Sequence, residues 1–147
     1  MKGRECEKRG CENMEDEIYS DVILDLYKHP SNRGELEKRT VRLSGGNPLC
    51  GDEVQFDLLI EGQKIVDVLF NGSGCTISSA AESVVAELVK GKKVGEALAL
   101  EKEALFAVIG EIMEARVKCA LLGLFVVREG LRRWKETGET EVSGLRI

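Results

Sequence analysis

Three cysteines, Cys50, Cys75 and Cys119, are the residues of this sequence whose types and placement best fit chemistry. Each lies at a junction between expected elements: the first in a glycine-rich loop, the second before a helix and the third at the start of the last helix. A thiol near a helix N-terminus feels the positive end of the helix dipole, which favours thiolate. Arg116 and Lys118 lie beside Cys119 and act in the same direction. Because thiolate binds metal and attacks sulfur, the sequence indicates metal binding or sulfur transfer.

A metal site built on these cysteines needs the fold to bring them together, since their intervals are too long for a local zinc knuckle. Three sulfurs also need a fourth ligand, and Asp52, two residues from Cys50, is the nearest candidate. The oxygen would be the weak ligand of such an asymmetric site, as expected for a site that releases its metal. The single histidine, His29, precedes Pro30, and we interpret it as structural.

The alternative is that the three cysteines are unrelated core residues, because free cysteine often behaves as a small hydrophobe. Glycines beside two of the thiols argue against this alternative, namely Gly51, Gly72 and Gly74. Glycine has no side chain to cover a neighbouring sulfur. This arrangement is poor for core packing and good for ligand access.

The elements that position these residues follow from the spacing of apolar side chains. Ser20 is a candidate cap for a short helix that extends to about Lys28, and His29 and Pro30 end it. Alternation of apolar residues predicts strands over 40–43, 54–60 and 66–70, with a hairpin turn at 61–64. Helical periodicity predicts helices over 78–90, 94–98, 101–113 and 119–135. The sequence therefore predicts an α+β fold, in which a three-stranded antiparallel sheet packs against several helices with the metal site at one end.

Length and composition indicate one globular domain. The chain has 147 residues, of which 43% are hydrophobic and 32% charged, so it can bury a core without disulfides. We predict a polar flexible N-terminal extension over 1–17, a scaffold domain over 18–136 and a polar C-terminal tail over 137–147. Cys6 and Cys11 lie in the extension. We interpret them as unstructured thiols, with metal binding by this pair as the alternative.

Charge and hydropathy exclude other classes. A net charge of −5 and a pI of about 5.1 argue against nucleic acid as the main partner and give no reason to expect adhesion to an anionic membrane. No apolar run reaches the ~18–20 residues of a spanning helix. The first residues have no apolar segment typical of a signal peptide, so we expect a cytoplasmic protein. In that reducing compartment, cysteines are more often metal ligands or reactive thiols than disulfides.

Three cysteine segments, 47–52, 72–78 and 115–119, resemble the signature segments of the IscU/SufU/NifU N-terminal family of iron–sulfur cluster assembly scaffold proteins. Residues 19–34 resemble the start of that family, and residues 90–92 resemble the turn after its long helix. The resemblance covers about residues 19–135, with the three motifs in the family's order.

The resemblance implies a function and a ligand set. Family members accept persulfide sulfur from a cysteine desulfurase, assemble iron–sulfur clusters, chiefly [2Fe–2S], and transfer them to apo-proteins. By motif, Cys50, Asp52, Cys75 and Cys119 would hold the cluster, Asp52 would keep it labile, and Cys119 would accept the persulfide. Zinc commonly occupies the same site when no cluster is present. The sequence leaves open whether two chains form a homodimer that shares one cluster.

The chain combines features of two branches of the family. IscU-type members carry a histidine before the third cysteine, where this chain has Lys118, as in SufU-type members that hold zinc on three cysteines and an aspartate. The interval before Cys119 is closer to IscU, while residues 113–118 replace the chaperone-docking stretch of IscU. We interpret Lys118 as a modulator that pairs with Asp52 until metal arrives. A solvated charge is the alternative.

Three hypotheses follow. The first is a cluster assembly scaffold, which is not an enzyme. The second is a zinc-dependent sulfurtransferase that relays persulfide and never builds a cluster. The third is a module whose zinc is purely structural. All three use the same residues, so they differ in what the site holds and releases.

Overall fold

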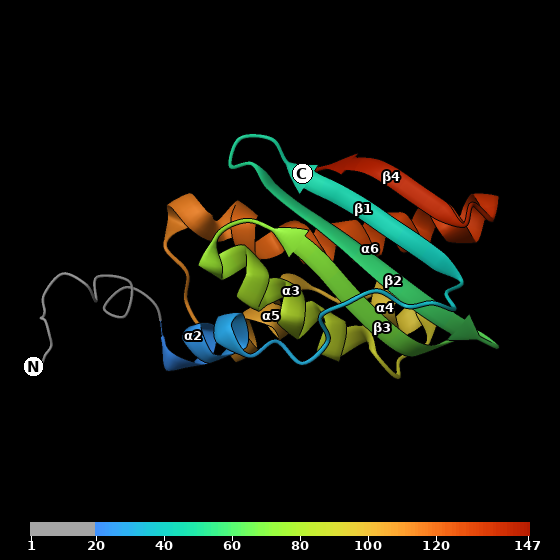
Figure 1. The fold of residues 1–147 in the computed structure, drawn as a ribbon, viewed down its shortest axis with the longest axis horizontal. Helices are drawn as coiled ribbons and strands as arrows, with labels where there is room; N and C mark the ends of the chain where they lie inside the picture. Colours follow the sequence, from blue (N-terminus) through green and yellow to red (C-terminus); the bar gives the residue numbers. More distant parts are fainter. Residues whose placement is uncertain (1–19) are drawn as a thin grey trace, which may run out of the picture.

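The computed structural model describes residues 20–147, and Figure 1 shows their arrangement. The expected extension 1–17, with Cys6 and Cys11, lies outside the described residues. The strands are β1 (Val41–Asn47), β2 (Asp52–Glu61), β3 (Lys64–Ser73) and β4 (Glu141–Arg146). The helices are α2 (Asp21–Lys28), α3 (Thr76–Val89), α4 (Val94–Leu98), α5 (Lys102–Ile109) and α6 (Val117–Thr137), with a short 3₁₀ turn, η2 (Glu114–Arg116), before α6.

One sheet of four strands, in the order β3-β2-β1-β4, forms one layer of the fold. The pairs β1–β2 and β2–β3 are antiparallel, whereas β4 runs parallel to β1. The α+β class is confirmed, but the prediction of three antiparallel strands is wrong. The missing strand, β4, lies in the segment that the sequence indicated as a polar tail.

The register of β4 explains why alternation did not reveal it. Its two buried side chains, Val142 and Leu145, are three residues apart, which does not match the two-residue period of a strand. A register shift against β1 and the left-handed Gly144, at φ 76°, bring both side chains to the core. Gly45 of β1 makes room, because a Cβ there would overlap the backbone of Leu145 and approach Val126 at 2.7 Å.

The helices cover one face of the sheet, with α3 and α6 packed against the strands (Figure 1). Phe56 and Phe70 lie at the centre of this core, with their ring centroids 6.1 Å apart. No helix within residues 20–147 combines the length and the apolar character needed to cross a membrane.

Several helix ends and turns form as predicted. Ser20 caps α2, its Oγ accepting a hydrogen bond from the Ile23 N–H at 3.2 Å. The hairpin turn expected over 61–64 joins β2 to β3 through Gly62 and Gln63, which both have positive φ, at 55° and 75°. The helix predicted over 101–113 is shorter, because Gly110 ends α5 at φ 82°.

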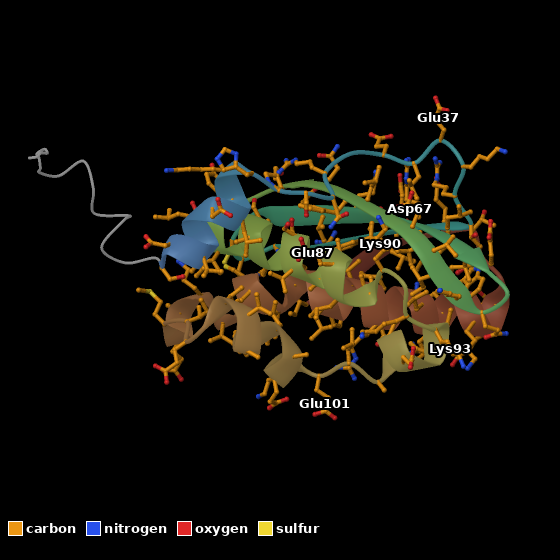
Figure 2. All side chains as sticks on the ribbon, turned by 90° about the horizontal axis from the view of Figure 1, so that it is seen from below. Glu37, Asp67, Glu87, Lys90, Lys93 and Glu101 are labelled. Atoms are coloured by element: carbon orange, nitrogen blue, oxygen red, sulfur yellow. The ribbon has the colours of Figure 1, made fainter. Side chains whose placement is uncertain are left out.

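Ion pairs and hydrogen bonds connect segments outside the sheet to its strands. On the face away from the helices, the fully buried Asp57 accepts hydrogen bonds from Arg42 Nε at 2.7 Å and from the Leu36 N–H at 3.0 Å. Near the end of α3, the Lys90 ammonium lies 3.5 Å from Asp67 Oδ1 on β3 (Figure 2). These contacts hold the segment between α2 and β1, and the end of α3, against the strands that lead to the site.

Candidate metal centre

The turn from β1 into β2 and the starts of α3 and α6 meet at one end of the sheet (Figure 1). Cys50 lies in the turn, Asp52 begins β2, and Cys119 lies in the first turn of α6. Their ligand atoms all lie within 4.8 Å of one another. The Cys119 thiol donates a hydrogen bond to Cys50 Sγ at 3.4 Å. The structure therefore brings together three of the four predicted ligands.

The fourth predicted ligand, Cys75, lies beside this group and makes different hydrogen bonds. It is the N-cap of α3, and its Sγ accepts a hydrogen bond from the Ser78 N–H at 3.4 Å. Its own N–H donates to Asp52 Oδ1 at 3.1 Å. Cys75 is therefore connected to Asp52 through its backbone, and its sulfur lies at the start of α3 beside the other three ligands.

Asp52 supplies the oxygen that a metal centre would use. The residue is 2% exposed, and its Oδ1 is taken by the Cys75 N–H. Its Oδ2 is buried and has no hydrogen-bond partner among the described residues. An unpartnered buried carboxylate oxygen costs free energy unless a ligand satisfies it. Thiols with one carboxylate are donors that zinc and iron accept, so the residues present fit such a metal.

The surroundings of Cys119 favour its protonated thiol. Burial raises the pKa of the Cys119 thiol, and hydrogen bonding with Cys50 and Asp52 raises it further. Charge on Cys75 and Asp52 acts in the same direction. These effects oppose the helix end and its basic neighbours, which the sequence analysis took to favour thiolate. A metal that binds here must replace the thiol proton, which links metal affinity to pH.

Lys118 and His29 lie outside the ligand group. Lys118 is exposed and forms no ion pair with Asp52 in the described part of the chain, so the expected pairing is absent. Successive helical residues point about 100° apart, so a buried Cys119 turns its neighbour outward. His29 is the C-cap of α2, its N–H donating to the Asp25 carbonyl at 2.8 Å, as the structural interpretation predicts.

Asn47 organises the turn that carries Cys50, a role that the sequence analysis missed. It is 1% exposed, and its carbonyl accepts hydrogen bonds from the N–H groups of Cys50 at 3.2 Å and Gly51 at 2.9 Å. Its Oδ1 accepts from the Leu49 N–H at 3.2 Å, and its Nδ2 donates to Cys50 Sγ at 3.6 Å. An asparagine before a proline in a glycine-rich loop is a turn signal that pointed to this role.

Glu82, also missed, is a second acid buried near the site. It lies on α3 two turns after Cys75, is 2% exposed, and has no hydrogen-bond partner for Oε2 among residues 20–147. Gly72 and Gly123 make room for this side chain. A Cβ on Gly72 would lie 3.3 Å from Glu82 Oε1, and a Cβ on Gly123 would lie 3.2 Å from Glu82 Cγ. Burial raises the pKa of this carboxyl well above its usual range, and the Asp52 charge adds to the effect. In the sequence, the signal that could have identified Glu82 was its spacing of seven residues, about two helical turns, from Cys75.

We expect Gly74→Ala to weaken metal binding. A Cβ at this position would overlap Asp52 Oδ1 and approach Ser78 Oγ at 2.6 Å, so the carboxylate must move. Displacing a group that orients a ligand typically costs about 10–100-fold in metal affinity. Competition of the protein with a chelator for Zn²⁺ measures the change. Gly95→Ala is the matched control, because no atom lies within 4 Å of its Cβ position. Equal affinities for the two variants would contradict the expectation.

Comparison with known proteins gives the family. The model of the NifU-like N-terminal domain matches residues 18–141. The zinc-dependent sulfurtransferase SufU of Bacillus subtilis is 32% identical, over 80% of this chain and 92% of that protein. The iron–sulfur cluster assembly scaffold protein IscU of Thermotoga maritima is 33% identical, over 79% of this chain and 94% of that protein.

A solved structure agrees with this assignment. The crystal structure described as a putative scaffold protein for the SUF system, from Fervidobacterium islandicum, superposes with a TM-score of 0.68 at 32% identity. It covers 78% of this chain and 97% of that one. With its cysteine segments meeting at one end of this fold, the chain belongs to the NifU-like N-terminal domain family, whose members include IscU scaffolds and SufU.

Proposed function

We propose that this protein is a cytoplasmic scaffold for iron–sulfur cluster assembly. It accepts persulfide sulfur from a cysteine desulfurase, builds a labile [2Fe–2S] cluster on Cys50, Asp52, Cys75 and Cys119, and passes the cluster to apo-proteins. The observation that carries the proposal is the meeting of Cys50, Cys119 and Asp52 within 4.8 Å, with the buried Asp52 Oδ2 unpartnered. Relatives described as cluster assembly scaffolds support it.

Sulfur reaches Cys119 through Cys50 in this proposal. Cys119 is fully buried, whereas Cys50 is exposed and its Sγ lies 3.4 Å away. The Cys50 thiolate attacks the terminal sulfur of the donor persulfide, and the donor thiolate leaves. The Cys119 thiol then passes its proton to Cys50, to which it donates a hydrogen bond, as its sulfur attacks that same outer sulfur, and Cys50 leaves as a thiol. Each step exchanges one sulfur–sulfur bond for another, so no further oxidant or reductant is needed.

Asp52 and Cys75 give the site its capacity to release the iron–sulfur cluster, which is its cargo. A carboxylate oxygen is a harder ligand than a thiolate and binds iron–sulfur cargo less tightly. The Cys75 sulfur exchanges its place at the α3 cap, where it accepts the Ser78 N–H, for a place on the cargo. Return of Cys75 to the cap offsets a small part of the loss of the cluster, because the backbone N–H regains its partner.

A second candidate function is a zinc-dependent sulfurtransferase that relays persulfide without building a cluster. Two observations favour it: Lys118 stands before the third cysteine, and SufU of Bacillus subtilis is 32% identical. Zinc would be held by the same four residues. Bound there, zinc would stabilise the thiolate form of the cysteines. The exposed Cys50 would be the ligand that exchanges during transfer.

Anaerobic reconstitution with iron, cysteine and a cysteine desulfurase tests the scaffold. We expect sulfide-to-iron charge-transfer bands in the ultraviolet–visible spectrum, with iron and sulfide bound in equal amounts. Replacement of Cys50, Cys75 or Cys119 by serine should abolish the bands, because each removes a thiolate. Cys11→Ser is the control and should keep them.

Other outcomes would change the assignment. Tightly bound zinc without a cluster, together with faster desulfurase turnover, would favour the sulfurtransferase. Bound zinc with no effect on the desulfurase would favour a structural zinc module. Retention of a full cluster by all three serine variants would contradict the proposed ligand set.

A further inference from the structure

We propose that Cys50 and Cys119 form a dithiol–disulfide couple, which a low-molecular-weight disulfide oxidises to an intramolecular bond that excludes Cys75. Asn47 is the positioning residue that aims Cys50 at Cys119. The inference rests on the arrangement of the thiols and the turn. It does not depend on the proposed function, although it acts on the same site.

The two sulfurs are already near bonding distance. Their separation of 3.4 Å must close to the ~2.05 Å of a disulfide. Cys119 lies on a helix in the core, so the turn that carries Cys50 makes most of this movement. Gly51, at φ 73°, gives that turn room, because no atom lies within 4 Å of its Cβ position.

Cys75 is excluded by its role in α3. Its Sγ accepts the Ser78 N–H and lies outside the group formed by Cys50, Asp52 and Cys119. Pairing with either of the other thiols would remove the cap from the backbone of α3. Of the three pairings among these cysteines, the structure therefore favours Cys50 with Cys119.

Cys50 reacts before Cys119, because Cys50 is exposed and Cys119 is buried. The exposed Cys50 thiolate attacks a small disulfide such as oxidised glutathione, forms a mixed disulfide and releases one glutathione thiolate. The buried Cys119 then loses its proton and attacks the Cys50 sulfur, which releases the second glutathione thiolate. The two cysteines lose two electrons and two protons in total, and the small disulfide gains them as two thiols.

Asn47 holds the geometry through both ends of its side chain. Its Nδ2 donates to Cys50 Sγ at 3.6 Å, while its Oδ1 fixes the Leu49 N–H at 3.2 Å. Asn47→Asp keeps the acceptor for Leu49 but removes the donor to Cys50 and puts a negative charge beside the attacking sulfur. This variant therefore tests the aim of Cys50 while retaining most of the turn.

The disulfide consumes two ligands of the metal centre, so oxidation and metal binding exclude each other. Zn²⁺ bound by Cys50 and Cys119 should protect both thiols from oxidised glutathione. The oxidised protein should bind no Zn²⁺ until a reductant restores it. The couple would thus stop the site from loading when small disulfides accumulate.

Thiol mapping of the full chain, stripped of metal and treated with oxidised glutathione, is the test. Free thiols are alkylated, and peptides are then identified by mass spectrometry. We expect Cys50 linked to Cys119 in at least about tenfold excess over any link to Cys75, because proximity gives the pair a high effective concentration. Glutathione should remain on Cys50 in Cys119→Ser, and Asn47→Asp should shift the product toward that mixed disulfide.

A double variant, Cys6→Ser with Cys11→Ser, should give the same link, and Zn²⁺ added first should prevent it. Links to Cys75 in equal yield, or glutathione that stays on Cys50 while Cys119 is present, would overturn the proposal. Failure of cluster reconstitution would leave the thiol map unchanged, so the two proposals can fail separately.

Discussion

Replacing Asp52 by alanine is expected to lower the affinity for Zn²⁺ by about 10²–10³-fold, the largest effect we expect of a single non-cysteine change. Four-ligand zinc sites bind with about 10–16 kcal/mol, so one ligand carries about 2.5–4 kcal/mol, and 1.4 kcal/mol is tenfold. The change also leaves the Cys75 N–H without its acceptor at 3.1 Å. Loss of the oxygen ligand and disturbance of the α3 cap act in the same direction.

Two further substitutions of Asp52 separate the contribution of its charge from that of its hard oxygen ligand. Asp52→Asn keeps an oxygen that can accept from the Cys75 N–H but removes the charge, so its affinity should lie between those of wild type and alanine. Asp52→Cys supplies a fourth soft ligand. It should bind Zn²⁺ at least as tightly as wild type and release a reconstituted cluster to apo-proteins more slowly.

Chelator competition gives the Zn²⁺ affinities, and the decay of the charge-transfer bands on addition of an apo-protein gives the release rate. Circular dichroism checks that each variant is folded. If Asp52→Ala bound Zn²⁺ as tightly as wild type, Asp52 would not be a ligand. If Asp52→Cys released its cluster at the wild-type rate, the oxygen would not be the source of lability.

Local pattern was sufficient to predict the elements that carry the site. Strand alternation, the hairpin turn and the Ser20 cap depend on neighbours in sequence, and the structure has all three, although each strand is longer than its predicted range. The placement of Cys50, Asp52 and Cys119 at the ends of elements made a shared site one of two interpretations, and the resemblance to the family selected it. Such positions transfer from sequence to space because loops that enter the same end of a sheet meet there.

The sequence could not reveal features that depend on packing between distant segments. Strand β4 forms because Gly45 admits Leu145, a contact between residues 100 apart in sequence that no local period records. The buried state of Glu82 depends on Gly72 and Gly123, which lie on other elements. The helix dipole at Cys119 was correctly located, but burial in the assembled core outweighs it and raises the pKa of that thiol.

Replacing the buried Glu82 by leucine is expected to stabilise the fold, the second large effect. At low pH the gain should be about 1–3 kcal/mol, the cost of a buried polar group without a partner. The site tolerates the change in size because the Glu82 stem already lies beside Gly123, a glycine that Phe56 also approaches. Urea unfolding followed by circular dichroism measures the free energy of unfolding of both proteins.

The gain should grow with pH. Burial, and then the charge of Asp52, raise the pKa of Glu82 well above its ordinary value, with Cys75 adding and Arg33 opposing. Below the unfolded value of about 4.3, both states hold the proton and ionisation of Glu82 does not affect stability. Above it, the unfolded chain releases a proton that the folded chain keeps. Wild type therefore loses stability as pH rises toward the folded pKa, whereas Glu82→Leu does not.

Glu82→Gln separates titration from polarity, because glutamine is nearly the same size as glutamate but does not ionise. Between pH 5 and pH 8, the stability of glutamine relative to leucine should stay constant, while that of wild type relative to glutamine should fall. A constant difference between wild type and glutamine would mean that Glu82 keeps the same charge in both states. Glu82 would then ionise alike in the folded and unfolded chains, and burial would not be the source of any pH dependence of folding.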